Sequence, residues 1–208
     1  MARYRKNPAE QHNRHSSPGH QTAALRIIGG ELRGRKLLYI GHLRTRPMKD
    51  RVREAVFNLL GCDTAGKHAI DLFAGTGALG LEAISRGSIR ATFVEQHFPT
   101  ARIIRQNAAL LGVAERCKVV SANVFPWVEN EPIDGSEPWL VFCSPPYAYF
   151  VEWQADMLAL MGKLVERAPA QSIFVVESDA RFDTGLFPSE PAWDVRQYPP
   201  AVVAIGRM

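Results

Sequence analysis

The sequence predicts an α/β fold in which a doubly wound, mostly parallel sheet follows a small basic N-terminal extension. Short apolar segments alternate with longer amphipathic ones, which is typical of a parallel sheet with helices on both faces. A glycine-containing turn at residues 71–80 joins a strand to a helix. Charge is divided along the chain, with 13 Lys and Arg against 3 Asp and Glu up to Arg53, and 12 against 18 thereafter.

Three segments are expected from composition and periodicity. Residues 1–23 have little apolar content and are predicted to be a disordered basic arm. Residues 24–61 are predicted to form the extension, with a β-hairpin at 25–37 and a helix at 48–60. Residues 62–208 are predicted to form the main, catalytic domain.

Strands and helices are predicted to alternate within the main domain. Strands are predicted at 69–70, 91–94, 117–121, 139–143 and 172–177, helices at 79–86, 99–111 and 152–167, an exposed loop at 129–138, and a terminal hairpin-like pair at 193–198 and 201–205. Right-handed crossovers bring the loops after parallel strands to one edge of the sheet. Polar residues that follow different strands should therefore line one crevice, and these are Asp71, Glu95, Asn123 and Ser144.

The turn that begins at Asp71 has the features of a site for an adenosine-type cofactor. Gly75, Gly77 and Gly80 have the spacing of a dinucleotide site, and Glu95 follows where an acid can bind ribose hydroxyls. Asp71, however, would repel a pyrophosphate and attract a cationic amino-acid group. This favours S-adenosylmethionine (SAM), which carries an ammonium and a sulfonium but no phosphate, over a nicotinamide or flavin. A structural turn without a ligand is the other alternative.

The predicted cofactor-binding residues lie in three segments that follow strands. They are Asp71, Phe73, Ala74, Gly75, Gly77, Glu95, Gln96, Asn123 and Val124. Asn123 could bond the edge of the adenine ring, or it could be a turn-forming residue at the end of its strand. The sequence leaves these two roles of Asn123 open.

The segment Ser144, Pro145, Pro146 and Tyr147 is predicted to be catalytic. The two prolines fix the loop and hold the residue before them in one orientation. Tyr147 offers a ring on which a nucleobase can stack. Acceptors beside such a ring could orient a planar amine toward the methyl group of SAM. The alternative is a Pro-Pro turn with a surface tyrosine.

The basic front of the chain predicts a polyanionic partner. The residues predicted to bind nucleic-acid phosphates are Arg33, Arg35, Lys36, Arg46, Arg51 and Arg53. A solvated basic arm is the alternative, and charge alone does not distinguish RNA from DNA.

The cysteines and the hydropathy pattern predict a cytoplasmic protein without a metal. Cys62, Cys117 and Cys143 are far apart and lack metal-ligand spacing. No apolar run is long enough to span a membrane, and the N-terminal segment has no apolar core of a secretory signal. A monomer is expected.

The chain also resembles the bacterial methyltransferases of the RsmD type, which modify guanine N2 in 16S ribosomal RNA. The resemblance runs from about Leu25 to the C-terminus. It rests on residues 26–30 and 33–37, on Arg46-Pro47 with residues 51–58, and on residues 71–83 and 85–87. It implies a Rossmann-like SAM-dependent methyltransferase fold, with SAM as donor. It also implies 16S rRNA or the partly assembled small ribosomal subunit as the partner.

Two positions depart from the pattern of the RsmD type. That family usually has Asp or Asn where this chain has Ser144, and Thr where it has Met48. A serine hydroxyl is shorter than a carboxylate or amide and is a poorer acceptor. The resemblance implies transfer to guanine N2 in 16S rRNA. The alternatives are a SAM- and RNA-binding homologue with weakened catalysis, or an amino-methyltransferase that acts on DNA or protein.

Overall fold

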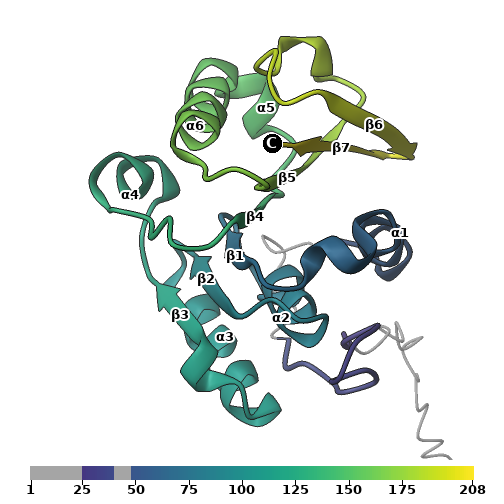
Figure 1. The fold of residues 1–208 in the computed structure, drawn as a ribbon, viewed down its shortest axis with the longest axis vertical. Coiled ribbons are helices and arrows are strands. Elements are labelled where there is room, and N and C mark those ends of the chain that lie inside the picture. Colours follow the sequence, from purple (N-terminus) through teal and green to yellow (C-terminus); the bar gives the residue numbers. More distant parts are fainter. Residues whose placement is uncertain (1–24, 40–47) are drawn as a thin grey trace, which may run out of the picture.

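The computed structural model describes residues 25–39 and 48–208 and is built around a seven-stranded sheet (Figure 1). The strands are β1 (His68–Asp71), β2 (Arg90–Val94), β3 (Cys117–Val120), β4 (Trp139–Cys143), β5 (Ile173–Asp179), β6 (Trp193–Tyr198) and β7 (Ala201–Arg207). Their order is β3-β2-β1-β4-β5-β7-β6; β1 to β5 are parallel, and β7 is antiparallel to β5 and β6. The predicted doubly wound, mostly parallel sheet is confirmed.

Helices cover both faces of this sheet, as Figure 1 shows. On one face lie α1 (Asp50–Leu60), α2 (Ala78–Ser85) and α3 (Phe98–Leu111), and on the other α4 (Val124–Asn130), α5 (Tyr149–Glu152) and α6 (Gln154–Arg167). Short 3₁₀ turns occur at Gly61–Thr64, Ala114–Arg116 and Thr184–Leu186. All five residues of β4 are buried, as expected for a parallel strand covered on both faces.

Residues 25–39 double back as predicted, but they do not form a regular β-hairpin. A single antiparallel bridge joins Arg26 to Lys36. The backbone amides of Ile28 and Gly29 instead donate to the two oxygens of the buried Glu82 on α2, at 2.7 Å each. These two donors are taken by a helix side chain, and regular strand pairing is lost.

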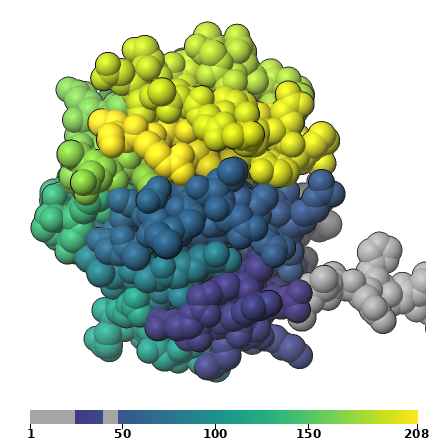
Figure 2. Space-filling view, turned by 45° about the vertical axis from the view of Figure 1, so that its right-hand side comes forward, coloured from purple at the N-terminus to yellow at the C-terminus, as the bar shows by residue number. Residues whose placement is uncertain are grey.

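This loop is held tightly against α2. A side chain at Gly30 would lie 1.9 Å from the carbonyl oxygen of Ser85, and Gly30 has a φ of +77°. Only glycine is compatible with both constraints. Figure 2 shows residues 25–39 at the surface beside the segment around α1, with the C-terminal strands on the other side of that segment.

Two helices differ from the sequence-based expectation. The expected loop at 129–138 overlaps α4, which begins at Val124 and includes Pro126 in its first turn, where proline is tolerated. The helix predicted at 152–167 is divided, because α5 ends at Glu152 before α6 begins. Within the described residues, no helix is long and apolar enough to cross a membrane.

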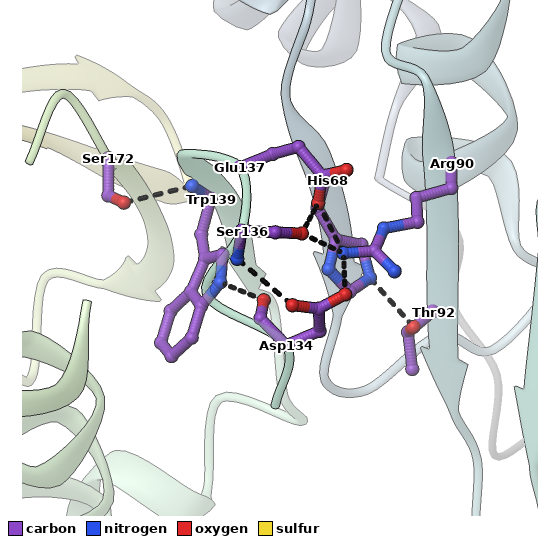
Figure 3. A network of polar contacts seen from close by, with 8 residues as sticks. All are labelled: His68, Arg90, Thr92, Asp134, Ser136, Glu137, Trp139 and Ser172. Carbon is purple, nitrogen blue, oxygen red and sulfur yellow. Dashed lines mark hydrogen bonds and ion pairs between the residues drawn. The ribbon is translucent and has the colours of Figure 1, made fainter. Parts of the chain in front are cut away.

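Charged and polar side chains are paired at the amino ends of the strands (Figure 3). Arg90 forms ion pairs with Asp134, at 2.8 Å, and with Glu137. His68 Nε2 lies 2.8 Å from the hydroxyl of Thr92. Burial lowers the pKa of His68 to about 4, so the ring is neutral at pH 7. This end of the sheet joins β1, β2 and the segment before β4.

Candidate functional site

A cavity of about 920 Å³ opens at the carboxyl ends of β1, β2 and β4, within the size range of small-molecule sites. Because β1 lies between β2 and β4, the winding of the sheet reverses beside it, and ligands bind at such positions. The structure brings these predicted residues together along its wall: Asp71, Phe73, Ala74, Gly75, Glu95, Gln96, Asn123, Val124, Ser144, Pro145, Pro146 and Tyr147.

Asp71 ends β1 at the floor of the cavity, and its carboxylate is 1% exposed. Its Oδ2 accepts a hydrogen bond of 3.2 Å from the backbone N–H of Gly80. Its Oδ1 is buried and has no hydrogen-bond partner among the described residues. Burial raises the pKa of Asp71 to about 7, and the carboxylate of Glu95 adds to the increase. Asp71 can therefore accept a donor from a ligand.

The glycines between β1 and α2 have different roles. Gly75 and Gly77 have φ values of +50° and +76°, which favour glycine. A side chain at Gly80 would lie 2.4 Å from the ring of Phe93 on β2, so Gly80 allows α2 to pack on the sheet. Gly77 is the N-cap of α2. It was predicted to contact the cofactor, but it is not among the residues that line the cavity.

Glu95 follows β2 and holds the glycine turn in place. Its Oε2 accepts from the backbone N–H of Gly75 at 2.8 Å, and its Oε1 accepts from the N–H of His97 at 2.7 Å. Half-buried at the cavity wall, this carboxylate is where the sequence predicted an acceptor for ribose hydroxyls.

Asn123 is the N-cap of α4, and its contact with adenine stays a prediction. Its side-chain oxygen accepts from the N–H of Phe125 at 3.0 Å and caps the N-terminus of α4. An adenine contact through this oxygen would compete with the cap. The neighbouring wall is aromatic: the Phe73 ring contacts Phe125 and Tyr149 edge-on. Sequence reasoning selected Phe73 but missed Phe125 and Tyr149, since aromatic side chains on separate segments give no local signal.

Ser144 and Tyr147 both bond to a residue that sequence reasoning did not select. The hydroxyl of Ser144 donates to Glu177 Oε2, and the hydroxyl of Tyr147 donates to Glu177 Oε1 at 2.8 Å. Glu177 lies on β5, is 5% exposed and lines the cavity. The sequence did contain a signal for Glu177. It is the last residue of the strand predicted at 172–177, and Asp71 likewise comes at the carboxyl end of the strand predicted at 69–70.

The predicted phosphate-binding residues are divided between the surface and the interior. Arg33, Arg35, Lys36 and Arg51 are exposed. Arg35 also donates to the carbonyl of Leu110, at 2.9 Å. Arg46 lies outside the described residues.

Arg53 does not fit the predicted role. Its side chain is fully buried, and its Nη2 donates to the carbonyl of Arg26 at 2.6 Å and to Asp50 at 3.1 Å. A guanidinium with no exposed surface cannot contact a phosphate, so assigning Arg53 to the RNA surface is wrong. The helical spacing gave a signal, because Arg53 falls on the same side of α1 as the buried Phe57 and Leu60.

Comparison with known proteins identifies the family. Residues 25–189 match a family model described as "Conserved hypothetical protein 95". The ribosomal RNA small subunit methyltransferase D of Escherichia coli (strain K12) is 35% identical over 183 residues, which cover 86% of this chain and 87% of that protein. The chain belongs to this RsmD family. The RsmD protein of Haemophilus influenzae is 33% identical over 135 residues, or 64% of this chain and 69% of that protein.

Solved structures support the same fold. A putative methyltransferase, yhhF, from Escherichia coli has a TM-score of 0.73 and 29% identity, with 88% of this chain and 97% of that chain covered. An RNA methyltransferase from Salinibacter ruber, crystallised with S-adenosyl-L-homocysteine, has a TM-score of 0.58 at 18% identity, with 78% and 93% covered, and shows likeness of fold alone. The RsmD chain has a Rossmann-like methyltransferase fold, and it is a SAM-dependent methyltransferase.

The residues present in this RsmD chain fit SAM. The buried Oδ1 of Asp71 lacks a hydrogen-bond partner among the described residues, and an ammonium group could supply one. Asp71 and Glu95 line the cavity, and neither forms an ion pair with a described Lys or Arg. Such a cavity suits a cationic ligand better than a phosphate.

Proposed function

We propose that this protein transfers the methyl group of SAM to the exocyclic N2 amine of a guanine in 16S ribosomal RNA, either free or in the partly assembled small subunit. The observation that carries the proposal is a single cavity that joins Asp71 and Glu95 to the Ser144–Tyr147 segment. The names of the RsmD relatives support ribosomal RNA as the substrate. The proposal takes the protein to act as a monomer in the cytoplasm.

The cofactor side of the cavity has three proposed contacts. Asp71 accepts from the amino-acid ammonium of SAM, Glu95 accepts from the ribose hydroxyls, and the backbone near Gly75 lies against the ligand. When bound, SAM would supply a methyl group on a positively charged sulfur. The lone pair of the amine nitrogen takes this methyl group as the C–S bond breaks and its electrons stay on sulfur, and the methylated nitrogen then loses its extra proton to water. Phe73, Ala74, Gln96, Asn123 and Val124 line the remainder of the proposed cofactor site.

The target base is proposed to occupy the Ser144–Tyr147 side. The ring of Tyr147 stacks on a guanine turned out of its helix or loop, which costs least when the base is already unpaired. The hydroxyl oxygen of Ser144 and the carbonyl of Pro145 accept hydrogen bonds from the amine, and Pro146 keeps the loop rigid. These contacts hold the nitrogen in line with the methyl group.

The RNA backbone is proposed to lie along the basic surface formed by Arg33, Arg35, Lys36 and Arg51, which are exposed. Cations there would neutralise phosphates and release counterions. Residues 25–39 carry three of these four cations and are hydrogen-bonded to α2, which follows the glycine turn after β1. This part of the basic surface is therefore attached rigidly to the cofactor site.

A methyl-transfer assay tests the reaction. The purified protein is incubated with tritiated SAM and 16S rRNA, free or in small-subunit particles, and the modified nucleoside is identified by digestion and chromatography. N2-methylguanosine is the expected product. Methylation of DNA or protein in place of rRNA, or SAM binding without transfer to any of these, would refute the proposal.

A salt titration tests the RNA surface. Arg33→Ala and Lys36→Ala should each weaken RNA binding and lower the slope of log affinity against log salt by about 1. The matched control is Lys163→Ala on α6, a partly exposed cation that is paired with Glu129 on the opposite face of the sheet. An unchanged slope for both variants would remove residues 25–39 from the RNA surface.

A further inference from the structure

We infer that Glu177 is a positioning residue, which orients the hydroxyls of Ser144 and Tyr147 so that Ser144 can accept a hydrogen bond from the target amine. The inference rests on the proposed function and deepens it. The RsmD type usually has Asp or Asn at the position of Ser144, and in this chain Glu177 on β5 places a carboxylate beside that position.

The sheet register places Glu177 beside Ser144. Cys143 on β4 pairs with Val176 on the parallel strand β5. Ser144 directly follows the last residue of β4, Glu177 is the next residue of β5, and both line the cavity. Their proximity therefore follows from regular strand pairing, which holds the carboxylate in a fixed place.

Both oxygens of Glu177 accept hydrogen bonds from the catalytic segment. Ser144 donates to Oε2, and Tyr147 donates to Oε1 at 2.8 Å. Glu177 is 5% exposed, and no described Lys or Arg forms an ion pair with it. No ion pair compensates for the burial of this carboxylate. Its hydrogen bonds to the two hydroxyls therefore do so.

The direction of the Ser144 hydroxyl determines what it can do to an amine. A hydroxyl has one proton to donate and two lone pairs that accept. When the proton points to Glu177, the lone pairs remain for the N–H groups of a substrate, and the charged acceptor strengthens the hydrogen bond that holds the hydroxyl in place. A hydroxyl without this acceptor could turn its proton toward the amine nitrogen and oppose methyl transfer.

Tyr147 is positioned by the same carboxylate. Its hydroxyl is held at Oε1 while its ring forms part of the cavity wall. Holding the hydroxyl limits where the ring lies, and hence where a stacked base can lie. Glu177 therefore serves two requirements of the reaction, the position of the base and the direction of its amine.

A binding comparison tests this inference without relying on turnover. Guanosine monophosphate and inosine monophosphate differ only in the N2 amine, and each is titrated by NMR into the protein loaded with S-adenosylhomocysteine. The parent should prefer the guanosine nucleotide by about five- to tenfold, the contribution of one hydrogen bond. Glu177→Gln should lose this preference, because an amide has only one accepting oxygen and its NH₂ group would turn one hydroxyl proton away.

Kinetics on rRNA provide the second measurement. Glu177→Gln should lower kcat about tenfold or more, with little change in the KM for SAM, and Glu177→Asp should recover part of the rate. Ser144→Ala combined with Glu177→Gln should cost no more than the larger single effect, since both act through one contact. The matched control is Asp179→Asn, which removes a β5 carboxylate that is paired with Arg181 and does not line the cavity.

The outcomes separate the two proposals. A parent that prefers the guanosine nucleotide but methylates no rRNA would refute the proposed function and leave the positioning role intact. A parent that shows no preference between the two nucleotides would overturn the role of Glu177. The same holds for a Glu177→Gln protein that keeps both the preference and the full kcat. Thermal unfolding of each variant excludes misfolding as the cause of a loss.

Discussion

The two ends of the sheet treat charged side chains in different ways. At the amino ends, Arg90 lies between Asp134 and Glu137 and is paired with both (Figure 3). At the carboxyl ends, Asp71 and Glu177 are at most 5% exposed, and neither forms an ion pair with a described cation. The sheet thus has ion-paired side chains at one end and, at the other, two buried carboxylates without an ion pair among the described residues.

This difference separates stabilising charges from functional ones. A buried carboxylate without a cation is unfavourable for folding, and such groups with shifted pKa values concentrate at ligand sites. Asp71 has this property, because burial raises its pKa to about 7. At the other end, the pKa of Asp134 is lowered to about 2 by hydrogen bonds from Ser136 and Arg90. The carboxylates at the amino ends are paired within the chain, whereas Asp71 at the carboxyl ends has an oxygen left for a ligand.

Of the changes considered, removing the charge of Asp71 should have the largest effect, and it should appear in ligand affinity. Asp71→Asn should weaken binding of S-adenosylhomocysteine about a hundredfold, equivalent to ~2.7 kcal/mol, because the ligand ammonium loses its charged partner. Calorimetry on the variant and the parent measures the change. Asp134→Asn, which removes a carboxylate from the opposite end, is the control and should bind the ligand like the parent. Equal affinities for all three proteins would contradict the distinction between the ends.

A buried hydrogen bond at the amino ends gives the next effect, which should appear in stability alone. Ser172 Oγ accepts from the backbone N–H of Trp139 at 2.8 Å, and both residues are buried. Ser172→Ala should lower the free energy of unfolding by ~1–3 kcal/mol, since the buried N–H then lacks a partner. Urea unfolding measures the loss. Ligand affinity at the far end should not change, and a large decrease there would mean that the two ends are coupled.

The pH dependence of ligand binding should follow Asp71. Its folded-state pKa is about 7, against an ordinary value of 3.8, so the carboxyl must lose a proton before it can bind a cation below pH 7. The affinity for S-adenosylhomocysteine should therefore fall by up to tenfold per unit as the pH decreases below 7. Titrations at several pH values test this. Asp71→Asn retains the titration of the ligand itself and should lack this additional dependence.

The same shift predicts the sign of a stability change in the ligand-free protein. Between about pH 4 and pH 7 the folded state binds the Asp71 proton more tightly than the unfolded state does. This contribution favours folding at acid pH and is lost as the pH rises through 7. The difference in stability between the parent and Asp71→Asn, followed by urea unfolding across this range, should shift in favour of the variant at higher pH. A difference that does not vary with pH would refute the assigned pKa.

Breaking the ion pairs of Arg90 should have the smallest effect. The side chain is 34% exposed, so solvent screens its attraction to Asp134 and Glu137. Arg90→Met, which keeps most of the apolar stem, should lower Tm by a few degrees at most, in the range expected for a loss of up to ~1 kcal/mol. Scanning calorimetry at low and high salt measures this, and the difference from the parent should shrink at high salt. A loss of ligand affinity would show that the network is more than structural.

Particular residues show how far sequence reasoning extends. The strand ends and the glycine turn placed Asp71 and Glu95 in one crevice, because strand ends in a parallel sheet share an edge. The same rule, applied to the carboxyl end of the strand predicted at 172–177, would have selected Glu177. Arg53 was placed on the RNA surface by its charge, although its helical position predicted burial. The contact of Arg53 with the carbonyl of Arg26, which is 27 residues away, required the folded chain.

Local patterns in the sequence determined the sheet, the turn after β1 and the acids that follow the first two strands. Hydrophobic periodicity and glycine geometry act over a few residues, so they can be recognised in the chain alone. The tertiary structure decided which groups are partners. Ser144 and Glu177 are 33 residues apart, and Ile28 and Glu82 are 54 apart. Contacts of this kind exist only when the sheet and α2 bring distant segments together, because their energy depends on distance in space and burial, which no local pattern encodes.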